Sequence, residues 1–454
     1  MPGSIELRKM RVLVVGLART GVATAQFCAK HNAIVTATDV RPESELGAVP
    51  AKLSEAGVAL ELGGHREKTY LAQDLIIPSP GVPADDPLLT KARAKKITVW
   101  SEIELAYRFL EGELIGITGS NGKTTTTTLV HHILKAAGKS TILAGNVGTP
   151  LISCVDQMNS QTWSVVELSS FQLELIDKFR PDIGVFLNLT PDHLDRHKTM
   201  EAYAAAKKRI FEKQTELDAA VLNADDARTV ALQPKKPEVF WFSRQKSVER
   251  GACVRGDDIV IAHHGKEEPV MKVAEIPIPG AHNVENALAA VTAARLAEVD
   301  ASTIGRAVRC FAGVEHRLEF VAEIGGVRYF NDSKATNVDA TLKALEAFSG
   351  RILIILGGKD KGSDYTVLQR PLREKAILAL LIGAAADKIE GQIAGSVAME
   401  RAGTMDRAVE LASQAARPGD VVLLAPACAS FDQFENYEQR GRVFKALVGK
   451  VQGE

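Results

Sequence analysis

Short apolar runs alternate with helix-length segments along most of the chain. The runs are RVLVVG (11–16), AIVTATD (33–39), DLIIPS (74–79), LIGITG (114–119), SVVEL (164–168), IGVFLNL (183–189), AAVLNAD (219–225), ILIILGG (352–358), LALLIG (378–383) and VVLLAPA (421–427). Strands of a parallel sheet are buried on both faces and are joined by helical crossovers, so they read as continuous apolar runs of this kind. The pattern predicts doubly wound parallel sheets and an α/β fold.

Two places along the chain indicate domain boundaries. The segment 101–113 leads from a helical pattern into a new strand, and the segment 311–317 precedes a hairpin-like pattern at 320–332. We predict three domains that cover residues 1–108, 109–312 and 313–454. The first and third read as Rossmann-like domains, and the second combines a parallel sheet with a P-loop-type segment. Within the second, the polar stretch 233–280 predicts a small antiparallel insertion.

Composition limits the partners of the chain. Its 454 residues carry 55 Lys and Arg against 56 Asp and Glu, a formal net charge of -1, so any phosphate binding must be local. The five cysteines form no CxxC pair, which indicates a reducing compartment rather than disulfides or a zinc site. The N-terminal residues lack the apolar core of a signal peptide, and no apolar run reaches membrane-spanning length. We expect a cytoplasmic protein with no nucleic-acid or membrane partner.

The segment TGSNGKTTTTTLV (118–130) brings glycines, a lysine and threonines to the point where a strand meets a helix. The strict Walker pattern requires a glycine at the position of Ile117, so that motif is absent. Backbone N–H groups at a helix start and the amine of Lys123 nevertheless suit a polyphosphate, and the hydroxyl of Thr124 can ligate Mg²⁺. The alternative is a glycine turn with a solvated lysine.

A metal-bound polyphosphate needs hard oxygen ligands, and two side chains after neighbouring strands are in a position to contribute. Glu167 ends the run SVVEL, where ligands of open α/β sheets gather. His193 follows the run IGVFLNL, although imidazole is a poor ligand for Mg²⁺. A solvated or capping carboxylate and a structural histidine are the alternative interpretations.

Three further groups have both a structural and a functional interpretation. Lys207 and Lys208 are adjacent on a helical segment, which is typical of a solvated face. Asn283 and Asn286 lie three apart on one face of a later helix, where Asn283 could cap the helix start. A third group gathers cationic, anionic and hydroxyl side chains in loops of the last domain: His316, Arg317, Asp332, Ser333, Lys334 and Thr336.

The first domain opens with a strand, a glycine turn, a helix and a second strand that ends in Asp39. This order is typical of a dinucleotide-binding unit, but Ala18 occupies the place of the middle glycine of the fingerprint. The domain could therefore bind NAD, as in a nicotinamide-dependent dehydrogenase, or it could bind a different nucleotide substrate.

The segment Thr118–Thr124, TGSNGKT, resembles the nucleotide loop of the Mur ligase family, whose members form amide bonds with ATP during peptidoglycan precursor assembly. The motifs HR (316–317), NDSKATN (331–337) and APACASFDQFENYEQRG (425–441) resemble those of the same family, and the resemblance spans essentially the whole chain. It implies ATP and two Mg²⁺ ions as cofactors, with a lysine carbamate as a further anion.

The resemblance assigns roles to individual residues. It implies contacts with ATP for Gly119, Ser120, Asn121, Gly122, Lys123, Thr124, Thr125, Asn283, Asn286, Arg317 and Asp332. It implies metal ligation by Thr124, Glu167, His193 and Lys207 as the carbamate, with Lys208 as the alternative position. It implies catalytic roles for Lys123, Glu167, His193, Lys207 and Lys334.

Substrate contacts divide between the first and last domains. The resemblance implies that the UDP-linked substrate is held by Leu17, Ala18, Arg19, Thr20, Asp39, Arg41, Gly81 and Asn146. It implies that the amino acid is held by Thr336, Lys361, Ser430, Phe431 and Tyr437, whose amine and hydroxyl groups suit the two carboxylates of an acidic amino acid.

Within the family, GLARTG (16–21), DVRP (39–42) and the segment 425–441 resemble the members that add D-glutamate to UDP-N-acetylmuramoyl-L-alanine. The expected reaction passes through an acyl phosphate and gives ADP and phosphate, because a free carboxylate does not react with an amine. Another Mur-type or folylpolyglutamate-type amino-acid ligase and a P-loop kinase are the alternatives. The sequence lacks the DNPR segment that marks the relative adding a diamino acid or lysine.

Overall fold

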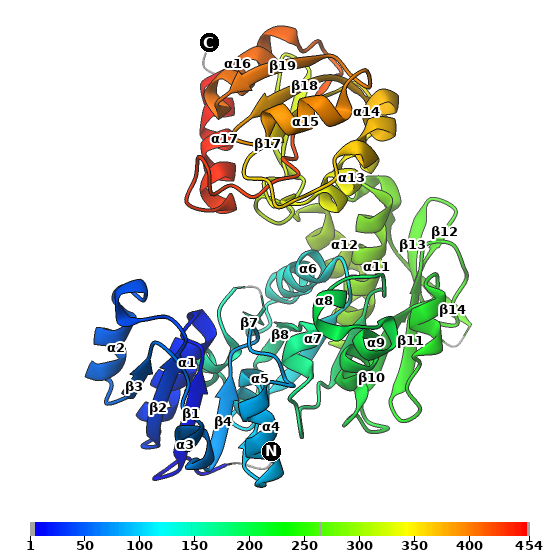
Figure 1. Ribbon diagram of the computed structural model, residues 1–454. Helices are drawn as coiled ribbons and strands as arrows, with labels where there is room; N and C mark the ends of the chain where they lie inside the picture. Colours follow the sequence, from blue (N-terminus) through cyan, green and yellow to red (C-terminus); the bar gives the residue numbers. More distant parts are fainter. Residues whose placement is uncertain (1–4, 147, 264, 452–454) are drawn as a thin grey trace. The chain divides into compact units, whose positions relative to one another are not determined.

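The computed structural model describes residues 5–146, 148–263 and 265–451 and contains three β-sheets (Figure 1). By internal contacts the chain divides into two compact units, Met1–Val273 with Glu285–Val308, and Ala274–Val284 with Arg309–Glu454. The first unit contains two of the sheets, and the second unit contains the third.

The N-terminal sheet is entirely parallel, with the strand order β3-β2-β1-β4-β5. Alternate residues of β1 enter different apolar clusters, Val12 and Val14 in one and Leu13 and Val15 in the other, so the strand is buried on both faces as its sequence predicts. The strands are β1 (Arg11–Val15), β2 (Ile34–Asp39), β3 (Ala59–Leu62), β4 (Leu75–Pro78) and β5 (Thr98–Val99). The helices are α1 (Arg19–Lys30), α2 (Val49–Glu55), α3 (Glu67–Leu71) and α4 (Pro87–Ala94).

The central sheet has the order β14-β13-β12-β11-β10-β9-β6-β8-β7. It is parallel from β7 to β12, and β13 runs antiparallel to both of its neighbours. The polar stretch 233–280 therefore does contain antiparallel strands, but they extend the main sheet and do not form a separate insertion. The strands are β6 (Glu113–Thr118), β7 (Thr141–Gly145), β8 (Trp163–Glu167), β9 (Ile183–Phe186), β10 (Ala219–Asn223), β11 (Glu238–Ser243), β12 (Arg250–Arg255), β13 (Asp258–His263) and β14 (Lys266–Lys272).

Helices are present at the four places in this region where the sequence predicts them: within 101–113, after the glycine-rich loop, at Lys207 and at Asn283. The predicted helix after the glycine-rich loop is α6, which begins at Lys123. The helices of this region are α5 (Glu102–Tyr107), α6 (Lys123–Ala136), α7 (Ser170–Leu173), α8 (Leu194–His197), α9 (Met200–Lys208), α10 (Ala227–Ala231), α11 (Ala281–Leu296) and α12 (Ala301–Arg309). No helix in the described part of the chain is long and apolar enough to cross a membrane.

The C-terminal sheet has the order β15-β16-β20-β17-β18-β19. The predicted hairpin at 320–332 is confirmed, because β15 and β16 pair antiparallel, while the other strands are parallel. The strands are β15 (Glu319–Ile324), β16 (Val327–Asn331), β17 (Ile352–Gly357), β18 (Ala376–Ile382), β19 (Met399–Gly403) and β20 (Val421–Leu424). The helices are α13 (Val338–Glu346), α14 (Gln369–Lys375), α15 (Ala386–Ile393), α16 (Met405–Ala415) and α17 (Tyr437–Val451).

Candidate functional site

The glycine-rich loop between β6 and α6 adopts a conformation that requires its glycines. Gly122 has φ of 83° immediately before α6, in the left-handed region. A Cβ atom there would overlap the side-chain oxygen of Asn286, and a Cβ on Gly119 would lie 2.9 Å from the Cβ of Leu187. Both glycines therefore permit a close approach of the loop backbone to neighbouring segments.

The segment between β9 and α8 braces this loop. The backbone N–H groups of Ser120 and Asn121 donate to the backbone and side-chain oxygens of Asn188, at 3.0 and 2.8 Å. The hydroxyl of Ser120 donates to the carbonyl of Thr190 at 2.9 Å. The loop is thus held by bonds that do not use the N–H groups at the start of α6.

Lys123 lies across the same loop, and the threonines behind it are buried. Its amine donates to the carbonyls of Gly119 and Ser120 at 3.0 and 2.8 Å. Thr124 and Thr125 are 6% and 5% exposed at the first turn of α6. The arrangement gathers an amine, hydroxyls and a helix N-terminus, which is the donor set that a polyphosphate requires.

Lys207 lies on α9, and its almost fully buried side chain reaches this loop. Its amine donates to the carbonyl of Gly119 at 2.8 Å and lies 4.8 Å from the ring of Tyr203. Burial, with a smaller effect of the Lys123 charge, lowers the pKa of Lys207 to about 6, while Asp192 and Glu167 oppose the shift. At neutral pH the amine is therefore largely uncharged.

Lys208, the alternative in the sequence, is exposed. The structure brings Lys207 to the nucleotide loop and directs its neighbour to solvent.

Glu167 ends β8 and is 2% exposed. One carboxylate oxygen accepts from the side-chain N–H of Asn146 at 2.7 Å. The other oxygen is buried and has no hydrogen-bond partner among the described residues. A buried carboxylate oxygen without a donor is unfavourable unless a cation neutralises it, so this geometry fits a metal ligand.

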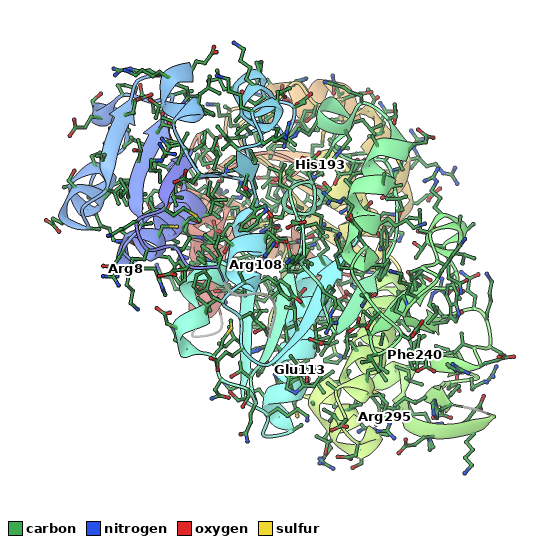
Figure 2. The ribbon with its side chains drawn as sticks, turned by 90° about the horizontal axis from the view of Figure 1, so that it is seen from below. Arg8, Arg108, Glu113, His193, Phe240 and Arg295 are labelled. Atoms are coloured by element: carbon green, nitrogen blue, oxygen red, sulfur yellow. The ribbon has the colours of Figure 1, made fainter. Side chains whose placement is uncertain are left out.

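His193, which is labelled in Figure 2, directly precedes α8. Its backbone lies in the left-handed region, with φ of 53°. It is separated from the end of β9 at Phe186, so it belongs to a loop and not to the strand end itself. Its side chain is 48% exposed, with Nε2 3.4 Å from the carboxylate of Asp192 and its ring 4.9 Å from the ring of Phe171.

Among the described residues, no group of three or more His, Cys, Asp and Glu side chains is arranged to hold a metal ion. The predicted ligand set contains one carboxylate, one imidazole, a hydroxyl and a modified lysine, so it would not form such a group. A metal ion held by this set would need the threonine hydroxyl and the lysine carbamate as ligands, in addition to the carboxylate and the imidazole.

In the N-terminal sheet, Asp39 braces the glycine turn. Its carboxylate accepts from the backbone N–H of Leu17 at 2.7 Å and from the guanidinium of Arg41 at 2.9 and 2.8 Å. Hydrogen bonds from Arg41 hold the pKa of Asp39 well below its usual range. Both oxygens are thus engaged within the domain, and Asp39 fixes the loop that the sequence assigns to the UDP-linked substrate.

A cavity of about 510 Å³ lies beside this loop. Its lining includes the predicted residues Leu17, Ala18 and Arg19, together with residues of α2, among them Lys52, and the segment 148–150. The other predicted contacts are not among its lining residues: Thr20, Asp39, Arg41, Gly81 and Asn146.

Asn286 and Asn283 both lie on α11, but they have different surroundings. The side-chain oxygen of Asn286 accepts from the hydroxyl of Thr126 at 3.3 Å, beside the nucleotide loop. Asn283, in the second unit, lies within the first turn of α11, and its side-chain N–H donates to the carbonyl of Pro279 at 2.6 Å, so this bond is not the N-cap bond of the structural interpretation.

In the second unit, Asp332, Ser333 and Lys334 follow β16. Burial raises the pKa of Asp332 to about 6, against the opposing charges of Arg317 and Lys334. The amine of Lys334 donates to the hydroxyl of Tyr437 at 3.2 Å, and the hydroxyl of Ser333 donates to the carbonyl of Tyr437 at 2.8 Å. The unit therefore brings Tyr437 to the NDSK segment.

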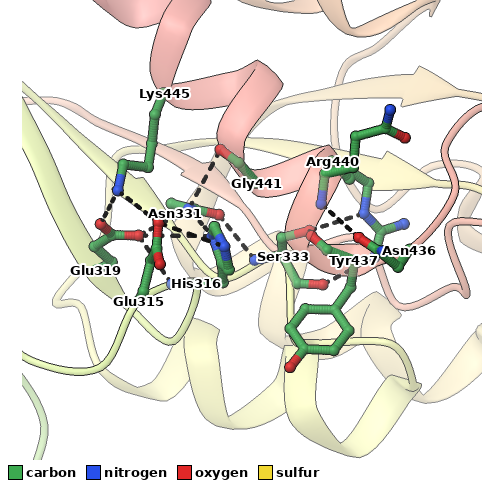
Figure 3. A network of polar contacts seen from close by, with 11 residues as sticks. Glu315, His316, Glu319, Asn331, Ser333, Asn436, Tyr437, Arg440, Gly441 and Lys445 are labelled. Carbon is green, nitrogen blue, oxygen red and sulfur yellow. Dashed lines mark hydrogen bonds and ion pairs between the residues drawn. The ribbon is translucent and has the colours of Figure 1, made fainter.

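His316 is buried in a polar network with the start of β15 (Figure 3). Asn331 lies 2.9 Å from its Nδ1 and donates to the carboxylate of Glu319, and Lys445 forms an ion pair with that carboxylate. Burial lowers the pKa of His316. These bonds fix the backbone that carries Arg317, whose Nε is buried without a hydrogen-bond partner among the described residues.

The remaining predicted contacts of the amino acid differ in exposure. Ser430 is buried, Thr336 is half-buried, and Lys361 and Phe431 are exposed. The structure does not join these four side chains by hydrogen bonds among themselves in the described part of the chain.

Several residues of the site were missed at the sequence level. Asn188, Thr190 and Asp192 follow β9 and surround the nucleotide loop or Lys207. Tyr203 lies on α9 one turn before Lys207, and Arg440 is a buried cation within the quoted motif 425–441. The polar residues after β9 could have been found from the rule that ligands gather at strand ends.

Family models match most of the chain. The Mur ligase middle domain matches residues 117–294, the Mur ligase glutamate ligase domain matches 316–428, and the MurD-like N-terminal domain of Mur ligases matches 10–101.

Curated relatives match over nearly the full length. A protein of Koribacter versatilis named UDP-N-acetylmuramoylalanine–D-glutamate ligase is 54% identical over 98% of this chain and 99% of its own length. Proteins with the same name from Acidobacterium capsulatum and Geotalea daltonii are 54% and 45% identical, over 98% and 99% of this chain and 97% and 99% of their own lengths.

Solved structures support the fold. UDP-N-acetylmuramate-alanine ligase of Thermotoga maritima has a TM-score of 0.59 at 18% identity, covering 98% of this chain and 99% of that chain. The MurF ligase of Thermotoga maritima has a TM-score of 0.60 at 16% identity, covering 99% and 98%. The predicted α/β architecture of three domains is confirmed, while the exact boundaries stay a prediction.

Proposed function

The chain belongs to the Mur ligase family, and on that premise we propose that it joins D-glutamate to UDP-N-acetylmuramoyl-L-alanine with hydrolysis of ATP. The observation that carries the proposal is 54% identity, over 98% of the chain, to a relative named for that reaction. The product would be the amide, released with ADP and phosphate as a step of peptidoglycan precursor synthesis. A cytoplasmic location follows from the proposal, because ATP and UDP-linked precursors are cytoplasmic compounds.

ATP is proposed to bind at the start of α6. The backbone N–H groups at the start of α6, from Gly122 to Thr125, would surround the β- and γ-phosphates, and Ser120 and Asn121, whose N–H groups bond to Asn188, would keep the loop in place. Lys123 would exchange its bonds to loop carbonyls for bonds to phosphate. Asn286 would face the adenine side of the site, since its oxygen already lies against Gly122 and Thr126. Contacts with ATP are also proposed for Arg317 and Asp332.

Two magnesium ions are proposed as cofactors, held by Thr124, Glu167, His193 and the carbamate of Lys207. The buried Glu167 oxygen that lacks a donor supports this assignment. When bound, the ions would neutralise the charge of the transferred phosphoryl group. The protein's contribution is to keep two of these ligands away from solvent, Glu167 at the buried end of β8 and the buried side chain of Lys207.

Lys207 is proposed to form the carbamate. Its uncharged amine attacks the carbon of CO₂, a new N–C bond forms, and one proton is released to solvent, which leaves an anion. A depressed pKa favours this step, because only the uncharged amine is a nucleophile. The new anion would face Lys123, whose positive charge would stabilise it.

Amide formation is proposed to proceed in two steps. An oxygen of the alanine carboxylate attacks the γ-phosphorus, the bond to ADP breaks, and an acyl phosphate forms. The amine of D-glutamate then attacks the acyl carbon, loses a proton, and phosphate leaves. Lys123 and Arg317 would stabilise charge on the phosphoryl group, and Lys334 would orient the incoming amino acid together with Tyr437.

The amino-acid carboxylates are proposed to contact Thr336, Lys361, Ser430, Phe431 through its backbone, and Tyr437. The UDP-linked substrate is proposed to occupy the cavity beside Leu17, Ala18 and Arg19, with its alanine end directed past Gly81 and Asn146 toward Glu167. The bond from Asn146 to Glu167 supports this direction, because it connects the predicted substrate contact to the predicted metal ligand.

Incorporation of radiolabelled D-glutamate, measured together with phosphate release, tests the proposal. We expect both only when ATP, UDP-N-acetylmuramoyl-L-alanine and D-glutamate are present together. Incorporation of L-glutamate or a diamino acid instead would assign the chain to another Mur-type ligase. Phosphate release without either substrate, or a stable phosphorylated product, would indicate a kinase.

A further inference from the structure

Arg196 lies on α8, one turn after His193, and contacts two regions of the first unit at once. Its side chain is 15% exposed, which is low for an arginine at a loop-facing position. The sequence assigned it no role. Its contacts are made by a guanidinium that offers five donors in a fixed plane.

One set of contacts is with the loop that follows β4. Nη2 donates to the carbonyl of Val82 at 3.0 Å, and Nη1 lies 3.4 Å from the carbonyl of Pro80 and 3.5 Å from that of Gly81. Three successive carbonyls of the N-terminal domain thus converge on one guanidinium. Gly81 is the residue in this loop that is proposed to contact the UDP-linked substrate.

The other set of contacts is with the segment after Glu167. Nη2 donates to the carboxylate of Glu174 at 3.1 Å, and the guanidinium carbon lies 4.6 Å from the ring centre of Phe171. The second oxygen of Glu174 lies 3.4 Å from His197 Nδ1, and His197 is 2.9 Å from the hydroxyl of Ser170. This half of the network is nearly buried, so it holds the guanidinium in one orientation.

We infer that Arg196 is a positioning residue for the UDP-linked substrate: it holds the loop 80–82 of the N-terminal domain against α7 and Glu174, next to the strand end that carries Glu167. The inference rests on the proposed function. The substrate has to reach from the N-terminal domain to the phosphoryl group, and a shift of about 1 Å in such an alignment lowers the rate strongly. Arg196 acts through the carbonyls of the loop and need not touch the substrate.

The test compares Arg196→Lys with Arg209→Lys. Arg209 is a matched control, because its guanidinium also donates to backbone carbonyls of this region, those of Leu173 and Ile176 at 3.1 and 2.8 Å. The hydrogen bonds that the structure describes for Arg209 do not reach the loop 80–82. A lysine at either position keeps the charge but loses the planar fork.

For Arg196→Lys we expect the KM for UDP-N-acetylmuramoyl-L-alanine to rise about tenfold, while the KM values for ATP and D-glutamate stay within about twofold. Arg209→Lys should leave all three KM values within about twofold, even if its unfolding temperature falls. A uniform change in all three KM values for Arg196→Lys, or a lowered unfolding temperature with unchanged KM values, would overturn the inference.

Glu174→Gln provides a second variant that keeps the side-chain shape. It removes the charge partner of Arg196 and should raise the same KM by a smaller factor, about threefold, with binding of the UDP-linked substrate weakened equally in calorimetry. An unchanged affinity of Glu174→Gln for the UDP-linked substrate would contradict the inference. This test remains available if Arg196→Lys does not fold. If the wild-type chain itself does not release phosphate with the three substrates, the proposed function fails, and the calorimetric comparison still decides whether Arg196 affects binding.

Discussion

In the described part of the chain, each unit contains a long cation that is almost completely buried, Lys207 in the first and Arg440 in the second, and the two differ in what burial does to them. Lys207 and Arg440 are both 1% exposed. Burial lowers the pKa of Lys207 to about 6 but that of Arg440 only to about 10, so at neutral pH the lysine is largely uncharged and the arginine is charged. The difference follows in part from the higher intrinsic pKa of a guanidinium and in part from the neighbouring groups, because Lys123 lowers the pKa of Lys207 further while Cys428 and Asp432 raise that of Arg440.

The hydrogen bonds of the two cations agree with this difference. Arg440 donates to the hydroxyl and the carbonyl of Ser333 at 3.0 and 2.9 Å (Figure 3). It also donates to the carbonyl of Cys428 at 3.1 Å. It therefore joins the NDSK segment to the segment before Ser430. Lys207 donates to the carbonyl of Gly119 at 2.8 Å and to the hydroxyl of Thr118 at 3.4 Å, and its uncharged amine keeps the lone pair that a reaction with CO₂ requires. One buried cation is a structural brace, and the other is suited to chemistry.

The largest expected effect is the loss of turnover in Lys207→Ala. Without the amine no carbamate can form, and we expect kcat to fall about a thousandfold, as for loss of a strongly stabilising charged group. The measurement is phosphate release at saturating substrates, and partial rescue by bicarbonate or a short carboxylate would support the carbamate. Activity close to that of the wild type would remove the carbamate from the mechanism.

The next effect is on stability, in Arg440→Ala. Removal of the guanidinium leaves buried oxygen acceptors of Ser333 and Cys428 without a donor, so we expect the free energy of unfolding of the second unit to fall by about 3 kcal/mol. Urea unfolding, followed by a probe in that unit, measures the change. If the variant unfolds with the wild-type midpoint, Arg440 is not the brace that its contacts indicate.

A smaller effect concerns pH. The lysine is protonated below about 6 in the folded chain and below its ordinary value of 10.5 in the unfolded chain, so between these values the unfolded state binds more protons. Stability should therefore rise with pH across this range, with a contribution from Lys207 of up to about 1 kcal/mol per pH unit. Urea unfolding of the wild type and of Lys207→Met at about pH 6.5 and 8.5 measures it. Equal slopes in the two proteins would contradict the lowered pKa.

The smallest effect is expected for Lys208→Ala, which serves as the matched control for Lys207→Ala. Lys208 is exposed, so we expect kcat and the KM values to stay within about twofold of the wild type. A large loss of activity in Lys208→Ala would indicate that Lys208, and not Lys207, is the lysine required for the reaction.

The choice between these two lysines illustrates what the sequence could and could not predict. Both positions lie on α9, and a one-residue step on a helix changes the face by about 100°, so the burial of one and the exposure of the other depends on the packing partner. Resemblance to a family pointed to Lys207, but only the position of the glycine-rich loop explains why that amine is buried. The pattern of apolar and polar residues therefore does not predict which face of a short helix is buried.

The ten apolar runs all contain strands, because their burial on both faces leaves a strong signal. The missed strands are short or only partly buried, such as β3 (ALEL), β7 (TILAG) and β19 (MERAG), and their mixed composition resembles loops. Glu167 was predicted because it ends a clear strand. The polar residues around His193 were incompletely predicted, because they lie in an irregular segment whose contacts come from the tertiary fold.

That irregular segment, between β9 and α8, has a practical consequence for inhibition. Asn188 and Thr190 at its start hold the glycine-rich turn, while Arg196 on α8, the helix that follows it, holds the loop 80–82. A small molecule that pushed this stretch out of place would loosen two binding regions together. Such a compound would need to mimic neither a nucleotide nor a sugar-linked precursor.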